Sequence, residues 1–235
     1  DVGTVANPPS GGTDNDEGES FGYSMVMDDH FLHISAPFRT TSRNFTAEGV
    51  VWSYKKNYGG SDNWGPSVGY RNPYDYRNAL NFGNAMAYSN EYLAIGAWQA
   101  RISGELRSGH VVIVKFDVES NSRTNIQEIE PPTKNQRFGT SLAFADNANY
   151  LIVGCSPYYN SSVDKSVRIS LKDVFVYRRT GDVFSLISTI RNSNDHWQDY
   201  FGKCLAHNGE SIIIGSPGPA YESETKYAIQ SLEDS

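Results

Sequence analysis

The sequence predicts an all-β protein built from four copies of one structural unit. Four Phe-Gly pairs recur along the chain about 60 residues apart, a period typical of repeat architectures. Each pair is followed by a short apolar run that ends in a turn of small residues. The pairs are Phe21-Gly22, Phe82-Gly83, Phe138-Gly139 and Phe201-Gly202. No segment carries a helical period over three turns, so strands are the expected elements.

The first unit sets the expected order of strands. Its first strand is predicted at residues 21–27, its second at 31–35 and its third at 49–54. These runs are rich in Val, Ile, Tyr, Phe and Trp and are bounded by Gly, Pro, Asn and Asp, as strands are. Equivalent third strands are predicted at 109–116, 173–177 and 226–229, and fourth strands at 124–130 and 183–190.

The sequence pattern that the four units share has a physical explanation. The glycine of each pair permits a close approach between backbones. The turn that closes the second strand contains proline in three units, as in Ala36-Pro37. Proline ends the strand because it has no N–H to continue the ladder.

The residues resemble a known repeat. The order Phe-Gly, then a Gly-Ala-Pro-like turn, then Gly-x-Val-x-Val-Tyr is similar to the FG-GAP repeats of integrin α-subunit propellers, over roughly residues 21–232. The resemblance implies a β-propeller, in which each repeat is a four-stranded blade around a central axis. The implied blades span residues 21–81, 82–137, 138–200 and 201–235. Residues 1–9 are expected to form an outer strand, and residues 10–20 a flexible acidic linker.

Two arrangements of the blades stay open. Four blades can close a ring, with residues 2–6 completing the last blade as a strap. Alternatively, they form an arc of a larger propeller, usually of seven blades in the family that the repeats resemble. An arc would leave two blade faces with exposed apolar surface, which favours association with further blades. The resemblance favours the arc.

The composition narrows the class of partner. The net charge is −7 and no basic stripe is present, which argues against nucleic acid. No run approaches the roughly 20 apolar residues of a membrane-spanning helix. The chain begins without a signal-peptide pattern, so any export signal is expected to have been removed or to lie outside it.

Metal ions, cofactors and catalysis have little support. In integrin-type repeats, the turn between the first and second strands often binds calcium. The equivalent turns here, such as 27–30 and 88–91, lack alternating oxygen ligands around a central glycine, so no calcium and no cofactor is expected. No nucleophile elbow, zinc helix or phosphate loop occurs. The five histidines are scattered, and His33 and His110 are expected on strand positions. We therefore expect a protein without catalytic residues.

The cysteines and the N-glycosylation sequons are relevant to the cellular location of the protein. Cys155 and Cys204 fall in adjacent units, where they are either bridged or free and buried. The sequons at Asn44 and Asn160 both fall between second and third strands, where a glycan would be exposed. Their matching place favours a secreted or cell-surface glycoprotein.

The length of the connections predicts where function resides. Connections from second to third strands, and those leading into each Phe-Gly pair, are long and should emerge on one face. Elaborated loops on a rigid scaffold are typical of a recognition surface. Arginine and aromatic side chains there are candidate binding anchors, or else pack their own loops: Arg39, Tyr74, Tyr76, Trp98, Arg101, Tyr158, Tyr159, Trp197 and Tyr221. The favoured function is adhesion or assembly through a protein partner, and the alternative is a carbohydrate-binding propeller.

Overall fold

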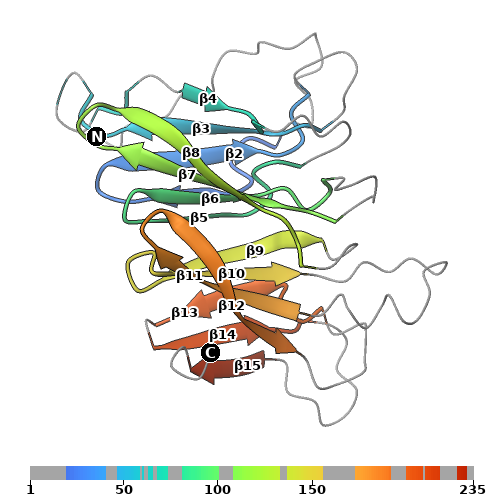
Figure 1. Cartoon of the computed structure of the whole chain (residues 1–235). Coiled ribbons are helices and arrows are strands. Elements are labelled where there is room, and N and C mark those ends of the chain that lie inside the picture. Colours follow the sequence, from blue (N-terminus) through green and yellow to red (C-terminus); the bar gives the residue numbers. More distant parts are fainter. Residues whose placement is uncertain are drawn as a thin grey trace.

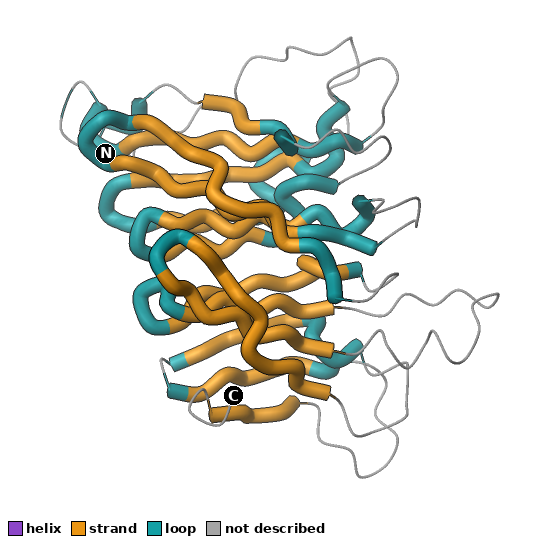
Figure 2. The backbone as a smooth tube through the Cα atoms, viewed as in Figure 1, coloured by secondary structure: helices purple, strands orange, loops and turns teal. Residues whose placement is uncertain are grey.

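The computed structural model describes residues 20–40, 47–58, 60, 63–65, 68–73, 81–100, 108–132, 137–155, 173–191, 200–208, 210–217 and 227–231. Within these ranges the chain forms strands and turns without a helix, which confirms the all-β prediction (Figure 2). It follows that these ranges contain no helix of the length and apolar character needed to cross a membrane.

The strands form four antiparallel sheets, each following the order of the chain. The first sheet contains β1 (Met25–Met27), β2 (Phe31–Ala36), β3 (Val50–Lys55) and β4 (Val68–Tyr70). The second contains β5 (Met86–Ser89), β6 (Tyr92–Gly96), β7 (Val111–Asp117) and β8 (Ser122–Ile129). The third contains β9 (Phe138–Ala145), β10 (Tyr150–Cys155), β11 (Asp173–Thr180) and β12 (Val183–Arg191). The fourth contains β13 (Cys204–His207), β14 (Ser211–Gly215) and β15 (Tyr227–Ser231).

The four sheets lie in a row, from the first at the top of Figure 1 to the fourth at the bottom. The first strands of successive sheets contact each other, β1 with β5, β5 with β9, and β9 with β13. The first and fourth sheets lie at opposite ends of the row. The described sheets therefore form an open series, and the closed four-bladed ring is not the arrangement found.

Alternating side chains give each inner sheet two buried faces, because successive residues of a strand point to opposite sides. In the second sheet, Leu93 and Ile95 pack against the first sheet, whereas Ala94 packs against the third. The third sheet repeats this pattern, with Leu151 toward the second sheet and Ile152 toward the fourth. Three apolar clusters thus fill the three spaces between sheets.

The Phe-Gly pairs form hinges at the points where the chain enters each sheet. The four glycines all have positive φ, at +88° for Gly22, +89° for Gly83, +83° for Gly139 and +82° for Gly202. The residue before each phenylalanine is also left-handed, with φ of 54° at Ser20, 47° at Asn81, 51° at Arg137 and 53° at Tyr200. Residues 21–24 form turns and bends, so the prediction of a strand from residue 21 is wrong. The first strand begins at Met25, and only β9 includes its Phe-Gly pair.

Three of the hinges rest directly on the preceding sheet. A Cβ added to Gly83 would lie 2.7 Å from Ser35 Cβ, and one added to Gly139 would lie 2.9 Å from the His110 carbonyl oxygen. At Gly202 it would lie 3.0 Å from the Cys155 carbonyl oxygen. Gly22, which has no preceding described sheet, has nothing within 4 Å of the same position. Close packing between sheets therefore requires glycine at three hinges, while positive φ favours it at all four.

The hinge phenylalanines occupy the spaces between sheets. Phe82 and Phe138 are 0% exposed, and Phe201 is 4% exposed. Phe82 packs between the first and second sheets, Phe138 between the second and third, and Phe201 between the third and fourth. Phe21 instead lies on the far face of the first sheet, edge-on to Trp52 at 5.6 Å between ring centroids.

The outer strands differ in part from the prediction. The fourth strands of the second and third sheets are present, and both pairings shift register at equivalent places, between Ile113 and Val114 and between Val176 and Tyr177. The sequence did not predict β4 in the first sheet, a strand of three residues that contains glycine. The strand and linker predicted in residues 1–19 lie outside the described residues, as does the strap at residues 2–6.

Candidate functional site

Most of the long connections lie at one edge of the row of sheets. Each sheet is an antiparallel meander, so the end of its second strand, the start of its third and the end of its fourth face the same edge. The bounding strand ends lie on the right of Figure 1, from Ala36 to Val50, Gly96 to Val111 and Cys155 to Asp173. We call this the connection edge, and the opposite one the turn edge. One long connection, from Lys55 to Val68, belongs to the turn edge.

Most predicted anchors fall outside the described residues. This applies to the following seven: Tyr74, Tyr76, Arg101, Tyr158, Tyr159, Trp197 and Tyr221. The sequons Asn44 and Asn160 also lie outside them. The structure describes Arg39 and Trp98.

Arg39 packs within its own sheet. The residue is 6% exposed, and its guanidinium lies 5.0 Å from the centroid of the Trp52 ring. Its backbone bonds both sides of the connection, since the Arg39 N–H donates to the Ala36 carbonyl (3.2 Å) and its carbonyl accepts from the Gly49 N–H (3.1 Å). These contacts fit the alternative in which the anchors hold down their own connections.

Trp98 lies at the connection edge between the second and third sheets. It is half-buried, and its indole N–H donates to Asn84 Oδ1 at 3.0 Å. The guanidinium of Arg137 lies 4.2 Å from its ring centroid, a cation–π distance. Asn84 also donates to the carbonyl of Thr140 at 3.3 Å. An aromatic ring, a cation and an amide thus meet here, and Arg137 was not among the anchors predicted from the sequence.

His110 joins the first and second sheets at the same edge. The side chain is fully buried; Nδ1 lies 3.0 Å from Glu128 Oε1, and Nε2 lies 2.8 Å from Asn72 Nδ2. Both ring nitrogens therefore face a polar side chain. The sequence predicted His110 on a strand, and it lies next to β7 rather than within it.

His33 and Ser53 form a buried pair between the same two sheets. Nδ1 lies 2.8 Å from Ser53 Oγ, a distance typical of a nucleophile and its base. However, Phe31, Tyr88 and Phe116 surround the imidazole, and burial lowers the pKa of His33 to about 3. A histidine of that pKa is a weak base at neutral pH. The pair therefore has the distance, but not the basicity, that catalysis needs.

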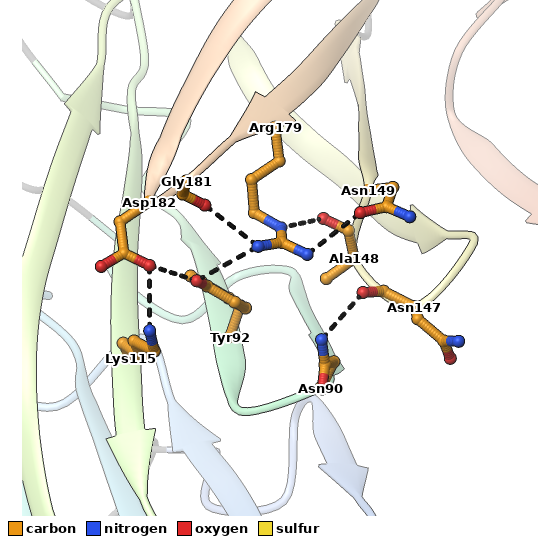
Figure 3. Close-up of polar contacts among 9 residues, drawn as sticks. All are labelled: Asn90, Tyr92, Lys115, Asn147, Ala148, Asn149, Arg179, Gly181 and Asp182. Atoms are coloured by element: carbon orange, nitrogen blue, oxygen red, sulfur yellow. Dashed lines mark hydrogen bonds and ion pairs between the residues drawn. The ribbon is translucent and has the colours of Figure 1, made fainter.

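A polar network joins the second and third sheets at the turn edge (Figure 3). The Lys115 ammonium lies 2.9 Å from Asp182 Oδ1, and the Tyr92 hydroxyl donates to the same carboxylate. The Tyr92 hydroxyl and Lys115 lower the pKa of the Asp182 carboxyl. Arg179 donates to the Tyr92 hydroxyl at 3.4 Å and to the carbonyl of Ala148 at 2.9 Å. Lys115 and Tyr92 belong to the second sheet, and Asp182 and Arg179 to the third, so these bonds link the two sheets.

The short turns between first and second strands use their own oxygens for backbone bonds. Asp28 Oδ1 accepts from the N–H groups of His30 (2.7 Å) and Phe31 (2.8 Å). Asn208 Oδ1 accepts in the same way from Ser211 (2.8 Å). Such turns form without a metal ion. Among the described residues no group of three or more His, Cys, Asp or Glu side chains is placed to hold one.

Both cysteines are free. Cys155 is buried, and burial raises the pKa of its thiol well above the usual range. Cys204 is exposed, which differs from the expectation of two buried thiols. The difference arises because β13 belongs to the fourth sheet, one face of which has no described sheet packed against it.

Comparison with known proteins supports the fold alone. No protein-family model and no curated protein match the sequence. One solved structure with a similar fold is that of a functionally unknown protein from Desulfotomaculum acetoxidans DSM 771. It is 13% identical with a TM-score of 0.50, and the match covers 83% of this chain and 48% of that one. The chain therefore spans about half the length of this structural neighbour.

Proposed function

We propose that the chain is a non-catalytic module of the β-propeller type that binds a protein partner through its connection edge. The observation that carries the proposal is the concentration of long connections at one edge of a row of sheets that are fixed to one another. A rigid scaffold with variable loops on one side is the usual design of a recognition surface.

The hinges support the propeller arrangement. Three times along the chain, a left-handed residue, a phenylalanine and a glycine place a first strand against the preceding one. The repetition of one geometry favours a constant rotation from sheet to sheet, as in propeller blades. The resemblance to FG-GAP repeats agrees with this reading, and the open row favours an arc that further blades would complete.

The exposure of the fourth sheet supports the arc. Ile213 of β14 is 45% exposed, whereas the residues at the equivalent positions of the second and third sheets, Ala94 and Ile152, are 0% exposed. In the second and third sheets this face is thus covered by the next sheet, whereas in the fourth sheet it is uncovered. Uncovered apolar surface of this kind favours association.

Trp98 and Arg137 are the described side chains best suited to contact a partner. Tryptophan and arginine are enriched among residues that dominate binding energy, because they offer large contact area together with hydrogen-bond donors. The sequons favour a secreted or cell-surface location, where a module of this kind would serve adhesion or assembly.

The test compares two edges of the same molecule. The immobilised chain is used to isolate partners from the extracellular fraction of its source, and the affinity of each partner is then measured. We expect Trp98→Ala to weaken binding by tenfold or more, since truncation of a binding hot spot costs about 2 kcal/mol. Glu210→Ala, at an exposed turn of the opposite edge, is the matched control and should bind as the original chain does.

Two results would change the proposal. If every partner binds Trp98→Ala and the original chain equally, the connection edge around Trp98 is not the binding surface. If no protein is retained but a glycan array shows selective binding that Trp98→Ala removes, the carbohydrate-binding alternative replaces the protein-binding one. Circular dichroism of each variant establishes that the sheets are intact.

A further inference from the structure

A cavity of about 190 Å³ lies between the first and second sheets, on the side of the turn edge. Two phenylalanines form its apolar wall, Phe31 of β2 and Phe116 of β7, which are 1% and 5% exposed. Five polar side chains also line it: Ser53, Lys55, Tyr58, Asn121 and Arg123. The described residues of the lining thus include two cations and no carboxylate, although the chain carries a net charge of −7.

Arg123 has hydrogen-bonding capacity to spare at this position. Its guanidinium lies 4.8 Å from the centroid of the Tyr70 ring, and Nη2 donates to the Gly69 carbonyl at 3.3 Å. Nη1 is buried and has no hydrogen-bond partner among the described residues. Buried donors are nearly always satisfied in folded proteins, and an exception calls for an explanation. An acceptor bound in the cavity would supply the missing partner.

Lys55 and Ser53 add two further donors to the lining. The Lys55 ammonium donates to the carbonyl of Val118 and has three N–H groups in all, so it can serve another acceptor. The exposed carboxylate of Asp117 lies close enough to interact with Lys55, but Asp117 is not part of the lining. Ser53 Oγ lies 2.8 Å from His33 Nδ1. When the imidazole donates in that bond, the serine hydroxyl is free to donate to a ligand.

The volume and the chemistry of the wall indicate the size and class of the ligand. An apolar cavity of about 150 Å³ takes up benzene. A cavity of about 190 Å³ has room for a ring and one small polar group. Aromatic rings pack favourably at the edges and faces of other aromatic rings, and a carboxylate is the natural acceptor for arginine and lysine.

We propose that this cavity binds a small aromatic carboxylate. The ring packs against Phe31 and Phe116, and the carboxylate accepts hydrogen bonds from Arg123 and Lys55. The site lies away from the connection edge, so it is independent of the protein-binding function proposed above. Success or failure of either experiment leaves the other proposal untouched.

The test is a titration of the ¹⁵N-labelled chain with benzoate, followed by amide chemical shifts. We expect saturable shifts at Ser53, Phe116 and Arg123. Benzamide has the same ring without the charge and should bind about tenfold more weakly, because hydrogen bonds to a charged acceptor are about twice as strong. Acetate and inorganic phosphate test the charge without the ring and should also bind more weakly than benzoate.

Variants then tie the binding to the cavity. Lys55→Met and Arg123→Gln should each weaken benzoate binding about tenfold, and Val68→Trp should block it, since the exposed Val68 lines the cavity. Lys203→Met removes an exposed cation just before β13 and should change nothing. If Arg123→Gln unfolds because its stacking on Tyr70 is lost, Lys55→Met and Val68→Trp still decide the question.

Three results would overturn the proposal. The first is the absence of shifts at these amides at about 10 mM benzoate, well above the dissociation constants of about 1 mM expected for weak small ligands. The second is equal affinity for benzoate and benzamide. The third is binding that Lys55→Met and Val68→Trp leave unchanged.

Discussion

The hinge glycines allow a direct measurement of how strongly one sheet rests on the next. Gly22 and Gly139 have nearly the same φ, +88° and +83°. An added methyl group would meet nothing within 4 Å at Gly22, but would lie 2.9 Å from the His110 carbonyl oxygen and 3.0 Å from Val111 Cγ2 at Gly139. The substitutions Gly22→Ala and Gly139→Ala therefore share the backbone cost and differ in the steric cost.

Both costs can be estimated from general magnitudes. An L-residue in the left-handed region loses about 1–2 kcal/mol. Forcing an extra methyl group into a packed interface costs a further 1–3 kcal/mol or so. We thus expect Gly22→Ala to lower the free energy of unfolding by about 1–2 kcal/mol and Gly139→Ala by about 2–5 kcal/mol.

The assay is urea unfolding, followed by tryptophan fluorescence and by far-UV circular dichroism. Coincident transitions and equal slopes establish that the two variants are compared between the same states. Equal losses of unfolding free energy for the two variants would refute the reasoning, because they would mean that Gly139 is not packed against the second sheet. A larger loss for Gly22→Ala would refute it as well.

Three further predictions concern thiols, pH and apolar packing. In the native chain Cys204 should react with a thiol reagent within minutes while Cys155 stays protected, as intact mass would show; rapid labelling of both would contradict the burial of Cys155. The pKa of His33 falls from 6.5 unfolded to about 3 folded, so the unfolded state binds more protons between these values. Stability should therefore fall as pH drops from about 6.5 toward 3, by up to about 5 kcal/mol, and His33→Leu should flatten this slope of unfolding free energy against pH. Ile152→Ala should cost about 2–5 kcal/mol and Ile213→Ala less than about 1 kcal/mol in urea unfolding, since only the former empties a packed space; similar losses would show that the fourth sheet is covered in solution.

Part of this fold could be read from local sequence signals. The strands β2 and β3 were predicted within one residue, because alternating β-branched and aromatic residues between turn signals specify strands locally. The third strand predicted at 173–177 continues to Thr180 as β11. The first strand of the first unit was predicted too long, at residues 21–27 instead of Met25–Met27. The residues before each phenylalanine (Ser20, Asn81, Arg137 and Tyr200) share a left-handed conformation without sharing a side-chain type. Nothing in a single sequence marks such a position. The strand β4 was missed because three residues that include a glycine give no periodic signal.

The candidate sites were less accessible to sequence reasoning. Arg39 was predicted as a binding anchor from its place in a long connection, but whether its guanidinium faces solvent or Trp52 depends on how that connection returns to the sheet. The cavity lined by Lys55 and Arg123 joins residues far apart in sequence and in different sheets. Only the packing of the two sheets brings these cations together.

By itself, the sequence determined the all-β class, the four units and the positions of most strands, because propensity, alternation and turn chemistry act over a few residues. Only the tertiary structure showed that the sheets form an open row. It also decided which hinge glycines contact a neighbouring sheet and which charged side chains line the same cavity. These outcomes depend on contacts between sheets, and such contacts are set by the rotation at each hinge rather than by the residues of any one strand.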